Sequence, residues 1–386
     1  MNTPSQPDPT TSTAVPATAA TAATGTRSDA QEATTVPVTG DQPGGARETT
    51  TAPVELAVQG LSVSYAVRQA GRQRHLRAVD DVSFELRRGE TLGLVGESGS
   101  GKSTIARALL RLVDADGGRA LFRGTDLLQL TGGALRAMRR HLQLIFQDPL
   151  ASLDPRMTVA QIIAEPLAVH EPALTAAERG EHVLQMVQSV GLAERHLHRF
   201  PHEFSGGQAQ RIGIARALIA RPEVILCDEP LASLDASIKS QIGNLLKDLQ
   251  QQMQLTLLFI SHDLATLRFS SDRLLVLYLG RVMELAARDA IFDRPRHPYT
   301  RALIQAIPAA DPGTRSMRAG APIQGEIPSP LSPPSGCVFR TRCPLAIERC
   351  AREVPPLRTV GDSLVACHRA EEVETLTEAA ASTETR

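Results

Sequence analysis

The sequence predicts an α/β fold with a parallel core sheet, and three observations support this class. First, mostly apolar runs occur at 91–95, 142–146, 224–227, 256–260 and 274–277, and several of them are unbroken, as is typical of strands buried on both faces. Second, helical stretches separate these runs, as in folds that alternate strands and helices. Third, a glycine-rich stretch at 96–103 lies where the first run turns into an apolar helical stretch at 105–110. This strand, loop and helix order is typical of a ligand-binding loop in such folds.

The N-terminal part, residues 1–53, is rich in Thr, Ala, Pro, Ser and Gly and shows no periodicity. Such a composition cannot bury enough apolar surface to order itself, so we expect a disordered leader. A transit peptide is the alternative, because Ser and Thr are abundant there. The scarcity of Arg and the presence of Asp and Glu favour the leader.

Short runs at 54–58, 61–65 and 78–86 come next, and apolar and polar residues alternate along them. Alternation with period two is typical of strands with one solvated face. We therefore expect a half-exposed antiparallel sheet before the glycine-rich stretch.

The glycine-rich stretch is a candidate nucleotide-phosphate loop. Its glycines let backbone N–H groups converge on phosphate oxygens, Lys102 supplies a positive charge toward the β- and γ-phosphates, and the Ser103 hydroxyl suits Mg²⁺. The helix that begins at Lys102 adds the positive end of its dipole. The candidate nucleotide-binding residues of this loop are Gly96, Glu97, Ser98, Gly99, Ser100, Gly101, Lys102, Ser103 and Thr104.

The apolar run at 224–227 ends in two acids, Asp228 and Glu229. A parallel strand delivers such carboxylates to the edge of the sheet where ligands bind in α/β folds. Asp228 suits Mg²⁺ held through water, and Glu229 suits a base that activates water. Cys227, one residue earlier, needs no role beyond filling a small core site.

Two regions depart from the alternating pattern. Between about 155 and 204 helix-like spacing replaces strand signals, which predicts an inserted helical subdomain. From about 294 prolines become dense, so residues 294–370 are expected to form a loop-rich appendage. Residues 371–386 are polar and are expected to be a disordered tail.

Composition excludes several classes of protein. The 386 residues carry a formal net charge of −1 and no long basic run, which argues against nucleic acid as a partner. No stretch approaches the roughly 18 consecutive apolar residues that a membrane span needs, and the N-terminus lacks the apolar core of a signal peptide. We therefore expect a cytosolic chain whose membrane association comes through partners.

Several motifs together resemble the nucleotide-binding subunit of an ABC transporter. They are Phe204-Ser205-Gly206-Gly207-Gln208 with 211–218, then Asp228-Glu229-Pro230, Ser233-Leu234-Asp235 and Ile260-Ser261-His262-Asp263. The resemblance covers about 54–368, and the Ser-Gly-Gly-Gln signature separates this family from other P-loop ATPases. It implies an ABC-type P-loop NTPase domain at 54–293, with a parallel core sheet, an antiparallel β-subdomain and an inserted helical subdomain.

The resemblance also implies roles for individual residues. Glu229 acts as the base, His262 contacts the γ-phosphate, and Gln147 reaches Mg²⁺ and the attacking water. Ser103, Gln147 and Asp228 form the magnesium site, and Tyr65 stacks on adenine. The signature residues cap ATP bound to the other subunit, so hydrolysis requires a head-to-tail dimer. The signature residues are Ser205, Gly206, Gly207 and Gln208, and the D-loop residue is Asp235.

The chain departs from the family pattern at few positions. Phe204 stands where leucine is commoner in the signature, and Leu231 and Ala232 precede Ser233 where Thr or Val and Ser are frequent. Neither departure removes a catalytic group, so the resemblance implies full ATP hydrolysis. A regulatory partner that binds ATP without cleaving it is disfavoured for the same reason.

Further segments narrow the resemblance. Residues 200–205, 297–303 and 326–331 look like the ATP-binding subunits of oligopeptide and dipeptide importers, with their C-terminal extension at 294–370. Gln208 and the segment 147–156 resemble the F-type subunit. The implied partners are a second ATPase, two transmembrane permease subunits and an extracytoplasmic peptide-binding protein, at the cytoplasmic side of a bacterial cytoplasmic membrane. A D-type subunit is the expected second ATPase, and a second copy of this chain is the alternative. Importers of nickel, glutathione or sugars are alternatives, as is a soluble ABC ATPase acting on ribosomes or DNA.

Four of the five cysteines crowd into the C-terminal extension: Cys337, Cys343, Cys350 and Cys367. Because the cytosol keeps thiols reduced, such a group favours a metal site over disulfides. Four thiolates without a CxxC pair fit an iron–sulfur cluster of the 4Fe–4S type at least as well as Zn²⁺. Four unrelated buried thiols are the alternative.

Overall fold

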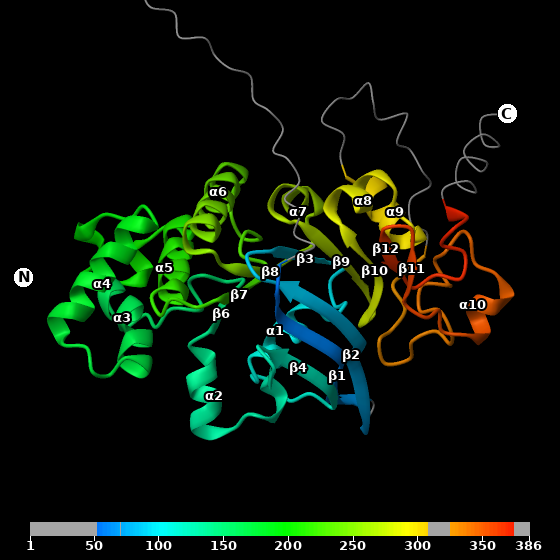
Figure 1. Cartoon of the computed structure of the whole chain (residues 1–386), viewed down its shortest axis with the longest axis horizontal. Helices are drawn as coiled ribbons and strands as arrows, with labels where there is room; N and C mark the ends of the chain where they lie inside the picture. The colour runs from blue at the N-terminus through cyan, green and yellow to red at the C-terminus, as the bar shows by residue number, and fades with distance from the viewer. Residues whose placement is uncertain (1–51, 70, 308–324, 374–386) are drawn as a thin grey trace, which may run out of the picture. The chain divides into compact units, whose positions relative to one another are not determined.

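The computed structural model describes residues 52–69, 71–307 and 325–373. These contain two β-sheets and their flanking helices (Figure 1). The expected leader at 1–53 and tail at 371–386 lie mostly outside the described residues. Within the tail, Val373 is buried and Glu371 pairs with Arg358, so the packed chain continues to Val373.

The first sheet is antiparallel, with strand order β2-β1-β4-β5. Its strands are β1 (Val54–Gln69), β2 (Arg72–Arg87), β4 (Gly117–Phe122) and β5 (Thr125–Asp126). The runs expected at 54–58 and 61–65 are two parts of one strand, β1. An irregularity around Gly60, whose φ is +61°, shifts the register against β2 and interrupts the alternating pattern between them. The expected antiparallel sheet is therefore present, and β4 and β5, which the sequence analysis did not identify, complete it.

The second sheet has eight strands in the order β11-β12-β10-β9-β3-β8-β7-β6. Neighbours from β9 to β6 are parallel, and all five correspond to the apolar runs of the sequence. They are β3 (Thr91–Val95), β6 (Leu142–Ile145), β7 (Val224–Asp228), β8 (Thr256–Ser261) and β9 (Arg273–Tyr278). Every residue of β3, β7 and β8 is buried. The predicted α/β fold with a parallel core sheet is confirmed.

Helix α1 (Lys102–Leu109) joins the two sheets. It contacts β7 of the second sheet and β2 of the first. Its apolar residues Ile105 and Leu109 belong to one buried cluster with Leu56 of β1 and Leu226 of β7. The start of α1 is thereby fixed between the two sheets.

The remaining helices cover the second sheet or extend beyond its ends. They are α2 (Gly132–Arg139), α3 (Val159–His170), α4 (Ala176–Ser189), α5 (Gly206–Leu218), α6 (Ala236–Met253), α7 (Leu264–Ser270), α8 (Arg288–Asp293), α9 (Pro298–Gln305) and α10 (Glu348–Arg352). Single 3₁₀ turns lie at Leu127–Gln129, Glu194–His196 and Pro201–Glu203. Within the described ranges, none of these helices has the length and apolar character that a membrane span requires.

The stretch expected to be helical, 155–204, contains α3 and α4, which both pack against α5. Each begins with a capping box, Thr158 with Gln161 and Thr175 with Glu178, which satisfies free N–H groups of the first turn. Figure 1 shows α3, α4 and α5 beyond the β6 edge of the second sheet.

The C-terminal extension lies at the opposite edge of this sheet. Besides loops it contributes β11 (Arg358–Val360) and β12 (Ser363–Val365), and β12 pairs antiparallel with β10 (Arg281–Ala287). A loop-rich appendage was expected, and the pairing with the core sheet was not. The extension is therefore hydrogen-bonded to the same sheet that carries the glycine-rich loop.

Candidate nucleotide site

The loop between β3 and α1 has a shape that only glycine permits at two positions. A Cβ atom on Gly96 would lie 2.1 Å from the carbonyl oxygen of Leu277. Gly101 has a φ of +103°, and a Cβ atom there would lie 2.2 Å from the carbonyl oxygen of Ala78. The neighbouring strands thus press the loop into a tight turn, which is the geometry that exposes backbone N–H groups to an anion.

Lys102 lies inside this loop and is only 5% exposed. Its Nζ donates to the carbonyl oxygens of Gly96, at 2.8 Å, and Glu97, at 3.0 Å. Burial lowers the pKa of Lys102, and the nearby carboxylates of Glu229 and Asp228 oppose that shift. The loop therefore surrounds a buried ammonium group, as a phosphate site requires.

Ser103 and Asp228 meet at the ends of α1 and β7. The Ser103 hydroxyl donates to Oδ1 of Asp228 at 2.6 Å. Burial raises the pKa of Asp228, and this hydrogen bond opposes the shift. A hydroxyl beside a carboxylate is an all-oxygen donor pair, which suits Mg²⁺.

Glu229 lies directly after β7 in a left-handed backbone conformation with φ of +47°. Its N–H donates to the carbonyl oxygen of Ile260, which fixes the turn against β8. Its Oε2 lies 2.9 Å from Nδ1 of His262 and accepts a long hydrogen bond of 3.5 Å from Nε2 of Gln147. The structure thus brings Gln147, Glu229 and His262 together from the ends of three adjacent parallel strands.

Tyr65 lies on β1 next to the start of α1. Its hydroxyl donates to Oγ1 of Thr104 at 3.4 Å, and its ring packs against the buried cluster shared by the two sheets. The structure therefore places Tyr65 beside the nucleotide loop. Its stacking on adenine stays a prediction.

The signature residues form the beginning of α5. Ser205 is the N-cap, its Oγ accepts from the N–H of Gln208 at 3.4 Å, and Oε1 of Gln208 accepts from the N–H of Ser205 at 3.1 Å. A Cβ atom on Gly207 would lie 2.6 Å from Cγ2 of Ile238 on α6, which explains the need for glycine there. Asp235 is exposed at the N-cap of α6. The capping role of Gln208 was not part of the sequence analysis, although the spacing of Ser205 and Gln208 indicates it.

The sequence analysis missed one group of contacts to the loop, which comes from the C-terminal part of the chain. The guanidinium of Arg342 makes two hydrogen bonds to the Glu97 carboxylate, of 2.7 and 3.0 Å. The Tyr299 hydroxyl accepts from the N–H of Glu97 at 3.1 Å. Arg342 and Glu97 are 245 residues apart, so no local pattern could have paired them.

The four cysteines of the extension, Cys337, Cys343, Cys350 and Cys367, line one small cavity together with His297 and Phe339. All four are free thiols. Burial raises the pKa of Cys343 to about 12 and that of Cys367 to about 11. Among residues 52–69, 71–307 and 325–373, no three His, Cys, Asp or Glu side chains are arranged to hold a metal ion. This arrangement does not supply the predicted iron–sulfur or zinc site.

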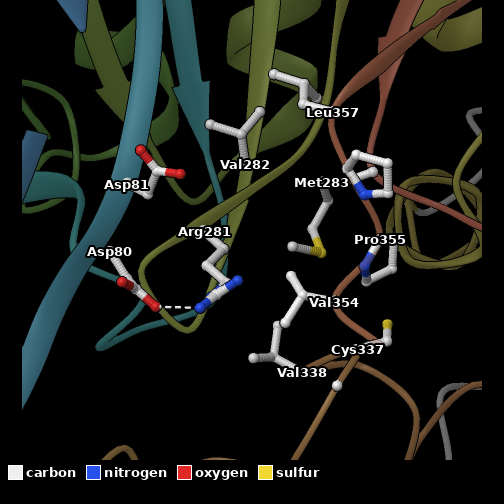
Figure 2. Close-up of a pocket in the computed structure, with 13 residues that line it drawn as sticks. Asp80, Asp81, Arg281, Val282, Met283, Cys337, Val338, Val354, Pro355 and Leu357 are labelled. Carbon is white, nitrogen blue, oxygen red and sulfur yellow. Dashed lines mark ion pairs between the residues drawn. The ribbon is translucent and has the colours of Figure 1, made fainter. Parts of the chain in front are cut away.

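A second pocket lies between the extension and the strands β2 and β10 (Figure 2). Asp80 and Arg281, which form an ion pair of 2.5 Å, lie on one side, and Val354 and Pro355 lie on the other. Cys337 lines this pocket as well as the four-cysteine cavity. Apart from this cysteine, no predicted site residue lines the pocket.

Comparison with known families gives two matches that together span most of the described chain. The family described as ABC transporter matches residues 79–232. The family described as Oligopeptide/dipeptide transporter, C-terminal region, matches residues 283–350. The first match contains the nucleotide loop and the signature, and the second contains Arg342 and three of the four clustered cysteines.

Curated relatives are similar over nearly their whole length. The oligopeptide transport ATP-binding protein OppF of Haemophilus influenzae is 50% identical over 318 residues, which are 81% of this chain and 96% of that protein. OppF of Escherichia coli is 49% identical over 320 residues, with the same two shares. A putative peptide import ATP-binding protein of Brucella ovis is 52% identical over 305 residues, which are 79% of this chain and 94% of the relative.

Solved structures share the fold of the nucleotide-binding part. A dimeric post-hydrolysis state of the ATP-binding cassette MJ0796, bound to ADP and Pi, aligns with a TM-score of 0.55 and 28% identity. It covers 60% of this chain and 98% of that structure. CbiO1 from Clostridium perfringens, part of an ABC transporter complex, aligns with a TM-score of 0.54 and 25% identity, covering 62% of this chain and 91% of that structure.

Proposed function

The chain belongs to the ABC transporter family, among the ATP-binding subunits of oligopeptide and dipeptide importers, and from this premise we propose that its ATP hydrolysis drives peptide uptake. The observation that carries the proposal is the meeting of Gln147, Glu229 and His262 beside the Lys102 loop. Phosphoryl transfer needs positioning and charge neutralisation more than covalent chemistry, and these residues supply both.

In the proposed mechanism the loop 96–104 binds the phosphates of ATP. The backbone N–H groups and the buried ammonium of Lys102 neutralise the β- and γ-phosphates. Ser103, Asp228 and Gln147 hold Mg²⁺, which when bound offsets charge on the phosphate oxygens. Tyr65 stacks on the adenine ring.

Glu229 then acts as the base. It accepts a proton from the water that attacks the γ-phosphorus, the bond from that phosphorus to the β-phosphate oxygen breaks, and ADP and phosphate form. His262, 2.9 Å from the Glu229 carboxylate, orients it and contacts the γ-phosphate. Gln147, on the other side of the same carboxylate oxygen, orients the water.

The proposed working unit is a head-to-tail dimer of ATPase subunits. Ser205, Gly206, Gly207 and Gln208 begin α5, and free N–H groups at such a helix end bind anions. They cap ATP held by the partner, with Asp235 nearby as the D-loop acid. The partner is a D-type second ATPase, and the pair docks on two permease subunits that receive peptide from an extracytoplasmic binding protein. The chain accordingly works at the cytoplasmic side of the cytoplasmic membrane.

A metal on the four cysteines is a separate proposal, and no step of ATP hydrolysis passes through it. Its support is that all four cysteines line one cavity, and four thiolates are the ligand set of many iron–sulfur clusters and zinc sites. Absorbance at about 400 nm in anaerobically purified protein would support an iron–sulfur cluster. Colourless protein that contains bound zinc would support a zinc site. Folded protein that is colourless and metal-free contradicts both.

The test of the proposed function is peptide uptake in a strain that lacks this chain. Labelled dipeptides and oligopeptides should enter only after wild-type protein is restored, and Glu229→Gln should not restore entry. Uptake of nickel, glutathione or a sugar in place of peptide would contradict the peptide assignment. A chain that does not co-purify with membrane proteins in mild detergent would contradict the transporter assignment.

A further inference from the structure

Glu97 places a carboxylate in a loop that binds anions. Its carbonyl oxygen accepts a hydrogen bond from Nζ of Lys102 at 3.0 Å, and its side chain lies near enough to influence the pKa of that lysine. A carboxylate free to rotate there would repel phosphate and compete for the lysine ammonium. The position of the Glu97 side chain therefore affects how well the loop binds a nucleotide.

Arg342 fixes that side chain. Its Nη1 and Nη2 atoms contact the two carboxylate oxygens of Glu97 at 2.7 and 3.0 Å, in the two-pronged geometry that makes arginine pairs strong. The Arg342 side chain is 7% exposed, so solvent screens this pair little. Its remaining hydrogen bond goes to the hydroxyl of Tyr278, at 3.3 Å.

The surroundings of Arg342 hold it in place. Tyr278, Tyr299 and Phe339 pack their rings on one another, with centroid distances of 4.8 to 5.3 Å. The Tyr299 hydroxyl also accepts a hydrogen bond from the N–H of Glu97. The C-terminal part of the chain therefore contacts both the backbone of Glu97, through Tyr299, and its side chain, through Arg342. Glu97 is thus the loop residue whose carboxylate pairs with an arginine of the extension.

We propose that Arg342 is a positioning residue for nucleotide binding, which holds the Glu97 carboxylate toward the extension and away from Lys102 and the phosphates. The extension thereby sets the affinity of the phosphate loop. Without Arg342 the carboxylate is released toward the ammonium of Lys102, which weakens ATP binding and leaves the hydrolytic residues in place. This role deepens the proposed function, because it takes ATP as the ligand of the loop.

The test is equilibrium binding of a fluorescent ATP derivative with Mg²⁺ to the purified full chain. Arg342→Met should bind the ATP derivative about tenfold more weakly, which is the size of effect expected when the Glu97 carboxylate loses its charged partner. Arg349→Met is the matched control, since Arg349 lies in the same extension and its side chain pairs with Glu353 where both are exposed to solvent; it should bind ATP like wild type. In the complex with the second ATPase and the permeases, turnover at saturating ATP should change little in Arg342→Met, so that KM for ATP rises while kcat stays near its wild-type value.

The decisive variant combines Arg342→Met with Glu97→Gln. If Arg342 acts by restraining the carboxylate, removing that carboxylate recovers binding to within about threefold of wild type. Arg342→Lys keeps the positive charge but cannot make the two-pronged contact, so its ATP affinity should lie between those of wild type and Arg342→Met. If Arg342→Met does not fold, Arg342→Lys takes its place in the test. Wild-type affinity in Arg342→Met, or a double variant as weak as Arg342→Met, overturns the proposal. A wild-type chain that binds no ATP overturns the proposed function instead.

Discussion

At the scale of single residues, the proposed hydrolytic centre depends on the turn that follows β7. Glu229 adopts a φ of +47°, which is unfavourable for a residue with a Cβ atom. The N–H of Glu229 is held by the carbonyl oxygen of Ile260, and its carboxylate is held by His262. Glu229 thereby lies near Lys102, whose pKa burial lowers and the Glu229 carboxylate raises.

Replacing Glu229 by Gln should therefore lower steady-state ATP hydrolysis by about 10²-fold to 10⁴-fold, since a general base contributes on that order. Binding of ATP should remain, because the phosphate loop is untouched. Glu223→Gln is the control: Glu223 lies just before the other end of β7, where it pairs with Arg123 and His141, and its loss should leave turnover unchanged. Near wild-type turnover in Glu229→Gln would show that another group is the base.

Asp228 gives a pH-dependent prediction. Burial raises the pKa of Asp228 above its ordinary value of 3.8, so the folded chain binds this proton more tightly than the unfolded chain. Ionisation of Asp228 therefore destabilises the fold progressively as the pH rises from 3.8 through the raised pKa. Asp228→Asn keeps an acceptor for the Ser103 hydroxyl and removes that cost.

Without nucleotide or Mg²⁺, Asp228→Asn should melt about 2–4 °C higher than wild type at pH 7.5, and the gain should shrink toward pH 4. Thermal melts across this pH range measure it. Asp362→Asn, at an exposed pair with Arg294, should show no such gain. A lower Tm for Asp228→Asn at every pH would mean that its charge stabilises the fold.

At the scale of elements, the start of α5 has two structural constraints and one proposed function. Ser205 and Gln208 cap the helix, and Gly207 lets the helix approach Ile238 of α6. The same N-terminal turn is the proposed contact with ATP on the partner subunit. Packing against α6 therefore determines where the signature lies.

Gly207→Ala should destabilise the fold by about 1–3 kcal/mol, because its Cβ atom would overlap Ile238 at 2.6 Å. Gly213→Ala in the same helix is a matched control, since a Cβ atom there meets nothing within 4 Å. It should stabilise the fold by up to about 1 kcal/mol through helix propensity. Denaturant unfolding of both variants decides the matter, and equal free energies of unfolding would refute the packing argument.

The sequence predicted the elements that carry the site and missed those that depend on distant contacts. The parallel strands could be predicted because burial on both faces makes each of them mostly apolar. Strands β4 and β5 have weaker patterns, and β5 spans only Thr125–Asp126. Strand β12 is three residues long, and its pairing with β10 follows from the tertiary fold and not from its own sequence.

At the scale of the whole molecule, the phosphate loop connects three parts of the chain. Lys102 and Ser103 come from α1, Asp228 and Glu229 from the end of β7 and the residue after it, and Arg342 from the C-terminal extension. The first two parts could be predicted because their motifs are local and follow strand ends. The third could not, since a basic residue among the loops of the extension gives no sign of its partner. The cysteine spacing suggested a metal site, but spacing alone does not fix how thiols face one another.

Nucleotide should stabilise the whole chain. ATP with Mg²⁺ at about 100 times its Kd should add about 2.7 kcal/mol to the free energy of unfolding, because only the folded loop binds it. Lys102→Met should lose most of this gain, since Lys102 is the buried cation of the loop. Thermal melts with and without nucleotide measure the difference, and an equal gain in both proteins would place the nucleotide elsewhere.

The most direct test of the central claim is ATP-dependent peptide transport by the complete complex in proteoliposomes, with the second ATPase, the permeases and the binding protein present. Wild-type protein should hydrolyse ATP and accumulate labelled oligopeptide together, and Glu229→Gln should abolish both while ATP still binds. Peptide accumulation that persists with Glu229→Gln, or hydrolysis by wild-type protein that moves no peptide, would contradict the account.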